Sequence, residues 1–292
     1  MECYRWVPSQ FNKETFHKSG VHLEKIRVIP EAIDTDYWQM SDSIPRFKVN
    51  SSFVKDDAIV FLSVFKWESR KGPEILLSSF MNEFSNSDNV CLLLKLDFSL
   101  SDTNSIKIVD GVPISHESNA QFLQFIFKSI ALEKKRTKNP KLVLERHQYL
   151  PCIIPFSSYM EYEDMRSLFA RANIYISTSK GEGWGLPTIQ AMSMGKLVIA
   201  PKFGGSTEYM NAQNSLLIDI DYMEPSSQLY GSVAVPDILH TRKLLRQSFK
   251  QYYNAEMKKL ANNARSTVVS KYQPRQVVAT MVEEIEKIAK QQ

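Results

Sequence analysis

The sequence predicts an α/β fold: a Rossmann-like parallel sheet with helices on both faces, followed by C-terminal helices. Short apolar runs rich in β-branched residues alternate with longer segments of helical period. This alternation is typical of parallel strands joined by covering helices. The chain has 292 residues, of which 43% are apolar and 23% charged, so it is large and apolar enough to bury such a core.

Six apolar runs are expected to form the strands of the sheet. They cover residues 59–65, 90–96, 142–147, 173–178, 196–201 and 215–220. Between these runs, apolar residues recur three and four positions apart and predict helices that lie on the sheet. The predicted helix faces hold Ile75, Leu76, Ser79 and Phe80; Phe122, Phe125, Ile126 and Ile130; and Met165, Leu168, Phe169 and Ala172.

The two ends of the chain predict further elements. Ser9 can cap a helix that ends at Gly20, and residues 26–33 are expected to form a strand. Residues 237–272 and 274–292 are predicted to be helical. The last helix carries an apolar stripe, formed by Val277, Val278, Met281, Ile285 and Ile288, which either packs on the sheet or contacts a partner.

Charge and cysteine content narrow the function classes. The sequence has 36 Lys and Arg against 32 Asp and Glu, a net charge of +4, which does not favour a nucleic-acid-binding protein. Cys3, Cys91 and Cys152 are few and far apart, so we expect neither a disulfide framework nor a zinc site and infer a reducing compartment. The N-terminus lacks the pattern of a signal peptide and no run could span a membrane, which favours the cytoplasm.

Three loops carry candidate binding residues. GEGWG at residues 181–185 and FGGSTE at residues 203–208 each follow a predicted strand, and Lys66, Arg70 and Lys71 follow another. The carboxyl ends of parallel strands lie at one edge of the sheet, where helix N-termini and close backbone approach favour anions. Either glycine loop alone could be a tight turn, but the three together predict a site for an anionic ligand.

These residues resemble the carboxyl-terminal half of retaining glycosyltransferases of the GT-B fold, of the group 1 or family 4 type. Lys66 with Lys71 and Gly72 matches a basic residue followed by the family's K-G. The loop of Glu182, Gly183, Trp184, Gly185, Leu186 and Pro187 matches E-G-[FW]-G-L-P, and Gly204, Gly205 and Glu208 match G-G-x-x-E. The similarity spans nearly the whole chain.

The resemblance implies roles for these residues. Lys66 and Lys71 would hold the diphosphate of a nucleotide sugar, and the backbone of residues 184–186, with Gly183, Gly204 and Gly205 in the two loops, would help to bind the donor. Glu182 would bind hydroxyls of the transferred sugar and is the expected catalytic residue. The position of Gln190 would receive the ribose. The family needs no metal, because cations and helix termini neutralise the leaving diphosphate.

Two departures from the family pattern affect the predicted function. Gln190 stands where the family has a second glutamate, and Lys66 stands where arginine is usual. The resemblance also implies that the chain lacks most of a first, acceptor-binding domain. We therefore predict a remnant and linker at residues 1–40, a donor-binding domain at 41–245 and C-terminal helices at 246–292.

Three functions stay open at this point. The chain is a glycosyltransferase donor half that acts on an unknown acceptor, a non-catalytic sugar-nucleotide-binding module, or a partner subunit that docks a separate N-terminal domain.

Overall fold

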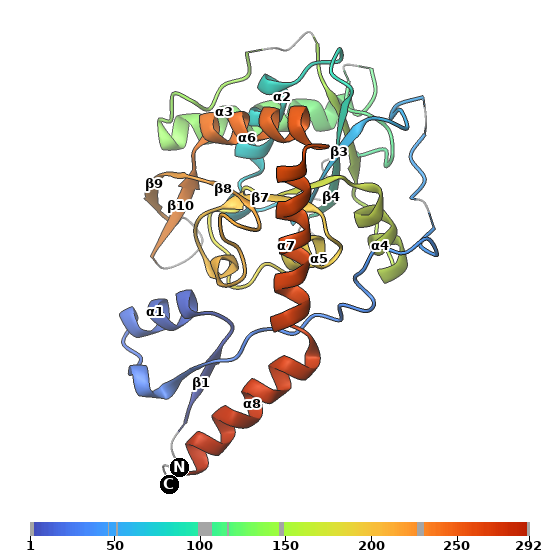
Figure 1. Ribbon diagram of the computed structural model, residues 1–292. Coiled ribbons are helices and arrows are strands. Elements are labelled where there is room, and N and C mark those ends of the chain that lie inside the picture. The colour runs from blue at the N-terminus through green and yellow to red at the C-terminus, as the bar shows by residue number, and fades with distance from the viewer. Residues whose placement is uncertain are drawn as a thin grey trace.

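The computed structural model describes residues 3–45, 47–50, 52–98, 107–115, 117–145, 149–226 and 231–290. Its centre is a six-stranded parallel sheet in the order β5-β4-β3-β6-β7-β8, surrounded by helices (Figure 1). The strands are β3 (Ile59–Lys66), β4 (Val90–Asp97), β5 (Cys152–Phe156), β6 (Ile174–Ile176), β7 (Leu197–Pro201) and β8 (Leu216–Ile218). The predicted α/β fold with a Rossmann-like parallel sheet is confirmed.

Helices cover both faces of the sheet because its strands are apolar on both sides. One face packs on α2 (Pro73–Glu83), α3 (Ala120–Thr137) and α6 (Ile238–Gln251), and the other on α4 (Tyr162–Arg171), α5 (Leu186–Ser193) and α7 (Ala255–Lys271). Successive strand residues alternate between the two cores: Phe61 belongs to the first, and its neighbours Val60 and Leu62 to the second. This is the two-residue period of a strand buried on both faces.

The strand order reverses between β3 and β6. The chain first places β4 and β5 to one side of β3, and it then returns through α4 to place β6 on the other side. Connections leaving two such neighbours diverge to opposite sides of the sheet, which opens a crevice beyond their carboxyl ends. The loops after β3 and β6 therefore face each other across this crevice.

A smaller unit is formed by the two ends of the chain. β1 (Arg5–Val7) pairs in parallel with β2 (Ile26–Val28), and α1 (Gln10–Lys18) and η1 (Leu23–Lys25) lie between them in sequence. α8 (Pro274–Ala289) runs down to the same region, so both termini lie together at the bottom of Figure 1. As predicted, Ser9 caps α1: its hydroxyl accepts the N–H of Asn12.

The strand expected at residues 142–147 is wrong. Within the described part of that run, residues 142–145 form no strand, and the edge strand is β5 (Cys152–Phe156) instead. Residues 151–156 contain Pro151 and Pro155, which do not favour a strand, since proline removes a backbone donor. Because β5 is an edge strand, only one of its sides needs ladder donors, and it tolerates Pro155.

Two further predictions are corrected. The single helix expected at residues 237–272 is interrupted, because α6 ends at Gln251 and α7 begins after its N-cap, Asn254. The run at 215–220 contains β8 and the start of a second strand, β9 (Ile220–Pro225), which pairs antiparallel with β10 (Ser232–Pro236). The predicted domain limits stay a prediction, although the limit at 245 lies inside α6.

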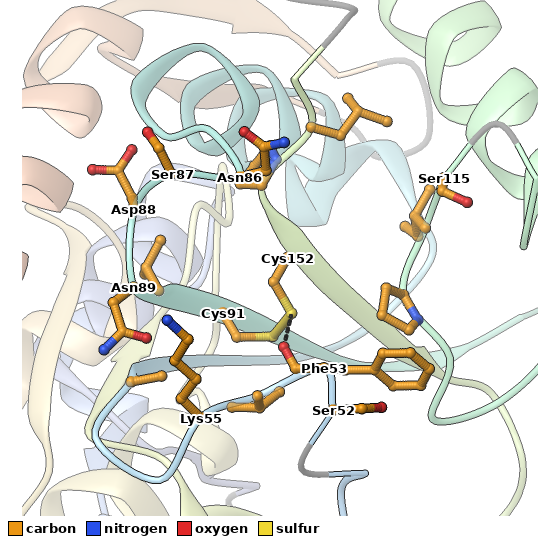
Figure 2. Close-up of a pocket in the computed structure, with 17 residues that line it drawn as sticks. Ser52, Phe53, Lys55, Asn86, Ser87, Asp88, Asn89, Cys91, Ser115 and Cys152 are labelled. Atoms are coloured by element: carbon orange, nitrogen blue, oxygen red, sulfur yellow. Dashed lines mark hydrogen bonds between the residues drawn. A yellow bond between two sulfur atoms is a disulfide. The ribbon is translucent and has the colours of Figure 1, made fainter.

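The structure also has one disulfide that the sequence did not predict, between Cys91 and Cys152. The two residues are partners in the parallel register of β4 and β5, with Cα atoms 4.6 Å apart, although 61 positions separate them in sequence. Figure 2 shows the pair lining a cavity of about 450 Å³ with Phe53 and Lys55 beside it. This cavity lies at the amino ends of the strands, away from the loops predicted to bind a ligand.

Candidate functional site

The structure brings the three predicted loops to one edge of the sheet. The short helical turn η2 (Ser69–Lys71) follows β3, the loop at residues 177–185 follows β6, and η3 (Gly205–Glu208) follows β7. β6 lies between β3 and β7, so the loop that carries Glu182 is flanked by the other two. The parallel direction of the strands is what places these sequence-distant loops together.

Glu182 and Lys71 are in direct contact at the centre of this edge. Lys71 Nζ lies 2.5 Å from Glu182 Oε1, and Arg70 Nη1 lies 3.4 Å from Glu182 Oε2. Arg70 Nη1 also donates to the carbonyl of Gly181 at 2.7 Å. Lys66 stands at the end of β3 and pairs with Glu68 at 3.2 Å. The predicted cations and the predicted carboxylate therefore share one site.

The two glycine loops pack on each other through their backbones. The N–H of Gly205 donates to the carbonyl of Glu182 at 2.8 Å. A Cβ at Gly205 would lie 1.7 Å from the carbonyl oxygen of Gly183, and Gly204 has a φ of 93°, so both positions favour glycine. Because the N–H of Gly205 already donates to Glu182, this loop fixes the backbone of the Glu182 loop.

Trp184 holds the same loop from inside the core. Its side chain is buried against Tyr209 and Tyr272, with ring centroids 5.0 and 5.4 Å away. The Tyr209 hydroxyl donates to the carbonyls of Trp184 at 2.7 Å and Gly185 at 3.0 Å. Burial, and after it the nearby Glu182 carboxylate, raises the pKa of Tyr209, so this hydroxyl stays a donor.

The N-terminus of α5 completes the edge. Gly185 is its N-cap with a φ of 94°, and Leu186 and Pro187 form its first turn. Pro187 has no N–H and the N–H of Thr188 donates to the carbonyl of Gly185 at 3.0 Å, so the N–H that this first turn can offer to a ligand is that of Leu186. The helix dipole makes this end positive. Such an end can receive an anion.

A cavity of about 640 Å³ opens beside this edge. Its charged lining consists of Lys66, Glu68, Arg70, Lys71, Lys95 and Asp97, and its further lining includes Tyr159, Met160 and Pro187. Burial lowers the pKa of Lys95, while Asp97 and Asp110 oppose that shift. With four cations and two carboxylates among these side chains, the cavity favours an anionic ligand.

Among the predicted site residues, Lys66 and Lys71 are the ones that line this cavity within the described part of the chain, whereas Glu182 and Gly185 line a much smaller neighbouring cavity with Lys71. Gln190 is half-buried on α5, a turn after Pro187, and it is not among the described residues that line the cavity. A Cβ at Gly204 would lie 3.1 Å from the carbonyl oxygen of Glu182, so Gly204 sits close against the Glu182 backbone. Their predicted roles in donor binding stay predictions.

Sequence reasoning missed two groups at this site. Arg70 was grouped with the cations but given no role, whereas it bridges η2 and the Glu182 loop. Lys180 was not considered at all, and it is a buried lysine two residues before Glu182. A lysine between a buried strand and a glycine loop was the available signal. Glu208, from the family pattern, accepts the N–H of Gln10 at the start of α1.

Comparisons with known proteins agree with this geometry. The family of group 1 glycosyl transferases matches residues 134–226, which include the Glu182 and Gly204–Gly205 loops. The chain is related to the group 1 glycosyltransferases of the GT-B fold. The matched residues 134–226 do not include Lys66 and Lys71. The structure, and not the family match, places these two lysines beside the Glu182 loop.

A curated protein to which the chain is similar is the alpha-1,3/1,6-mannosyltransferase ALG2 of Saccharomyces cerevisiae. The two are 23% identical over 253 residues, which is 82% of this chain and 46% of the yeast protein. The chain therefore spans about half the length of this relative.

Solved glycosyltransferases share the fold of the whole chain. A glycosyltransferase from Rickettsia africae superposes with a TM-score of 0.68 at 18% identity, covering 99% of this chain and 64% of that one. Anabaena HepE, in complex with UDP and glucose, gives a TM-score of 0.65 at 17% identity, covering 99% and 63%. Within the described parts of the chain, every helix is too short or too polar to cross a membrane.

Proposed function

We propose that this chain provides the donor site of a glycosyltransferase, which transfers a sugar from a nucleoside diphosphate sugar to an acceptor with retention of configuration. The observation that carries the proposal is the 2.5 Å contact of Lys71 with Glu182 beside the cation-lined cavity. It lies at the reversal of strand order, where open parallel sheets bind ligands. Both the family match and the fold support this assignment.

The cations would bind the diphosphate. The ammonium group of Lys71 has three protons, so its contact with Glu182 leaves two for phosphate oxygens. Lys66 at the end of β3 and the N–H groups of residues 184–186 at the start of α5 would bind further oxygens. We propose that no metal is needed, because these groups supply the positive charge.

The carboxylate of Glu182 would bind hydroxyls of the transferred sugar. Arg70 and Lys71, which line the cavity, hold this carboxylate beside it, and the Gly205 N–H fixes its backbone. During transfer the bond between the anomeric carbon and the phosphate oxygen breaks, the acceptor oxygen bonds to that carbon, and the proton of the acceptor passes to the leaving diphosphate. The electron pair leaves with the diphosphate, whose added charge Lys66 and Lys71 would stabilise. Gln190 would face the ribose.

A second candidate is a non-catalytic binding module or partner subunit that docks a separate N-terminal domain. An exposed apolar stripe on α8 favours it: Val278, Val282 and Ile285 are each about half exposed, whereas Val277 is buried. The chain also spans only part of its relatives. In either case we propose that a further domain, in the same protein or another chain, binds the acceptor.

Calorimetry with UDP, GDP and their sugar derivatives at millimolar concentration tests the donor site. We expect saturable heat with at least one of them, and its absence for folded protein would contradict the proposal. Release of the nucleoside diphosphate from the bound donor separates the candidates, because a binding module retains the donor intact.

With Cys91 and Cys152 paired, the cysteines no longer argue for a reducing compartment, and the cytoplasmic location stays a prediction.

A further inference from the structure

Lys180 is a fully buried lysine directly before the Glu182 loop. Its side chain is only 2% exposed. Nζ donates to Glu133 of α3 at 2.8 Å and to Glu224 of β9 at 3.2 Å, and it lies 2.8 Å from Glu74 Oε1 of α2. Three carboxylates from three separate elements thus surround one ammonium group.

Arg136 joins the same cluster. It contacts Glu133 at 2.5 Å and Glu224 at 3.0 Å, so two cations face three carboxylates. Burial opposes ionisation of Glu133, but hydrogen bonds from Arg136 and Lys180 outweigh it and lower the pKa of Glu133 to about 2. Burial raises the pKa of Glu74, while the charge and the hydrogen bond of Lys180 oppose that shift. The cluster is therefore strongly connected by ion pairs.

The backbone of Lys180 is tied to the loop that carries the predicted phosphate-binding cations. Its N–H donates to the carbonyl of Arg70 at 2.7 Å, and its carbonyl accepts the N–H of Ala234 at 2.9 Å. The next residue, Gly181, accepts from the Arg70 guanidinium at 2.7 Å. Lys180 is thus fixed at both its side chain and its backbone, between the scaffold and the η2 turn.

We propose that Lys180 is a positioning residue for the donor site: its buried ion-pair cluster fixes the Lys180–Glu182 segment against the turn that carries Arg70 and Lys71. The proposal rests on the proposed function, because it assumes that Lys71 binds a diphosphate. Lys180 lies beneath the loops and does not line the 640 Å³ cavity among the described residues, so it acts through Lys71 and Glu182. Without the cluster, the two loops lose their common register and the cations no longer converge on one anion.

A purely structural role is the alternative, since removing one member of a buried ion-pair network destabilises a protein wherever it lies. The chain offers a matched control in Lys196. This lysine is also buried, at 7% exposure, but it precedes β7 at the opposite edge of the sheet and donates to the carbonyl of Ala170. A comparison of Lys180→Met with Lys196→Met therefore separates the effect of losing any buried lysine from the effect of losing the one beside the Glu182 loop.

The test measures the Kd of the full chain for UDP and GDP by calorimetry, with the unfolding midpoint recorded for each variant. We expect Lys180→Met to weaken the tighter of the two complexes about tenfold, equal to about 1.4 kcal/mol, while Lys196→Met stays within twofold of wild type. Where Lys180→Met does not fold, Glu133→Gln takes its place with an expected threefold loss. Equal Kd values for the Lys180 or Glu133 variant and the Lys196 control would overturn the proposal.

A double-mutant cycle supplies a readout that a purely structural role would not move. In a Lys71→Ala background, Lys180→Met, or Glu133→Gln in its place, should weaken binding less than twofold, because the cation that it positions is gone. The same loss in both backgrounds would show that Lys180 acts independently and would overturn the inference, leaving the proposed function intact. No binding of either nucleotide by wild type would overturn both.

Discussion

Replacing Lys71 by alanine tests the assignment of the diphosphate site most directly. Lys71 Nζ is the group nearest to Glu182, and its side chain is 19% exposed, so it is shielded from much of the solvent. A charge-assisted hydrogen bond contributes about 1.5 to 3 kcal/mol. At about 1.4 kcal/mol for each factor of ten, its loss should weaken UDP or GDP binding by at least about tenfold.

Two features of the site modify this magnitude. Arg70 lies 3.4 Å from Glu182 and can take over part of the role of Lys71. Conversely, removing Lys71 also removes the positive charge that offsets the Glu182 carboxylate, so this carboxylate would repel a bound phosphate. The double variant Lys71→Ala, Glu182→Gln should therefore bind UDP more tightly than Lys71→Ala alone.

The assay is calorimetry with UDP and GDP, alongside circular dichroism to verify folding. Lys141→Ala is the matched control, because Lys141 is also held in ion pairs, with Asp221 at 2.9 Å and Asp237 at 2.7 Å, but does not line the cavity. We expect its Kd to stay within twofold of wild type. Equal weakening by both variants would refute the reasoning that Lys71 holds a special position.

Three further predictions concern binding and stability. Gln190→Glu should tighten UDP binding about fivefold, from about 1 kcal/mol for a charge in place of a neutral acceptor, and a loss of binding in calorimetry would contradict the ribose assignment. Gly205→Ala should lower the thermal midpoint by several degrees, because its Cβ meets the Gly183 carbonyl, whereas Gly181→Ala meets nothing within 4 Å and should not. Glu133 has a folded-state pKa lowered to about 2, so its contribution to the free energy of unfolding is present above its unfolded pKa and is lost as the pH falls from about 5 to 2. Across that window, Glu133→Gln should lose less stability to urea unfolding than wild type. Parallel plots of stability against pH for the two proteins would contradict this.

Most of the fold could be predicted because each strand is apolar over its own length. The runs that became β3, β4 and β7 are buried on both faces, and this property is local to the sequence. β5 was missed because Pro151 and Pro155 argue against a strand, and only its place at the sheet edge makes Pro155 acceptable. The β9–β10 hairpin was missed because β9 alternates between exposed and partly buried residues rather than forming an apolar run.

The sequence by itself determined the residue types of the candidate site, since Lys66, Lys71, Glu182 and the glycine loops are recognisable as motifs. Only the tertiary structure decided that they meet, because the contact of Lys71 with Glu182 joins residues 111 positions apart. Parallel pairing of β3 with β6 creates that contact, and strand pairing depends on the whole sheet. The same holds for Lys180, whose three carboxylates come from α2, α3 and β9 and become neighbours only when these elements pack together.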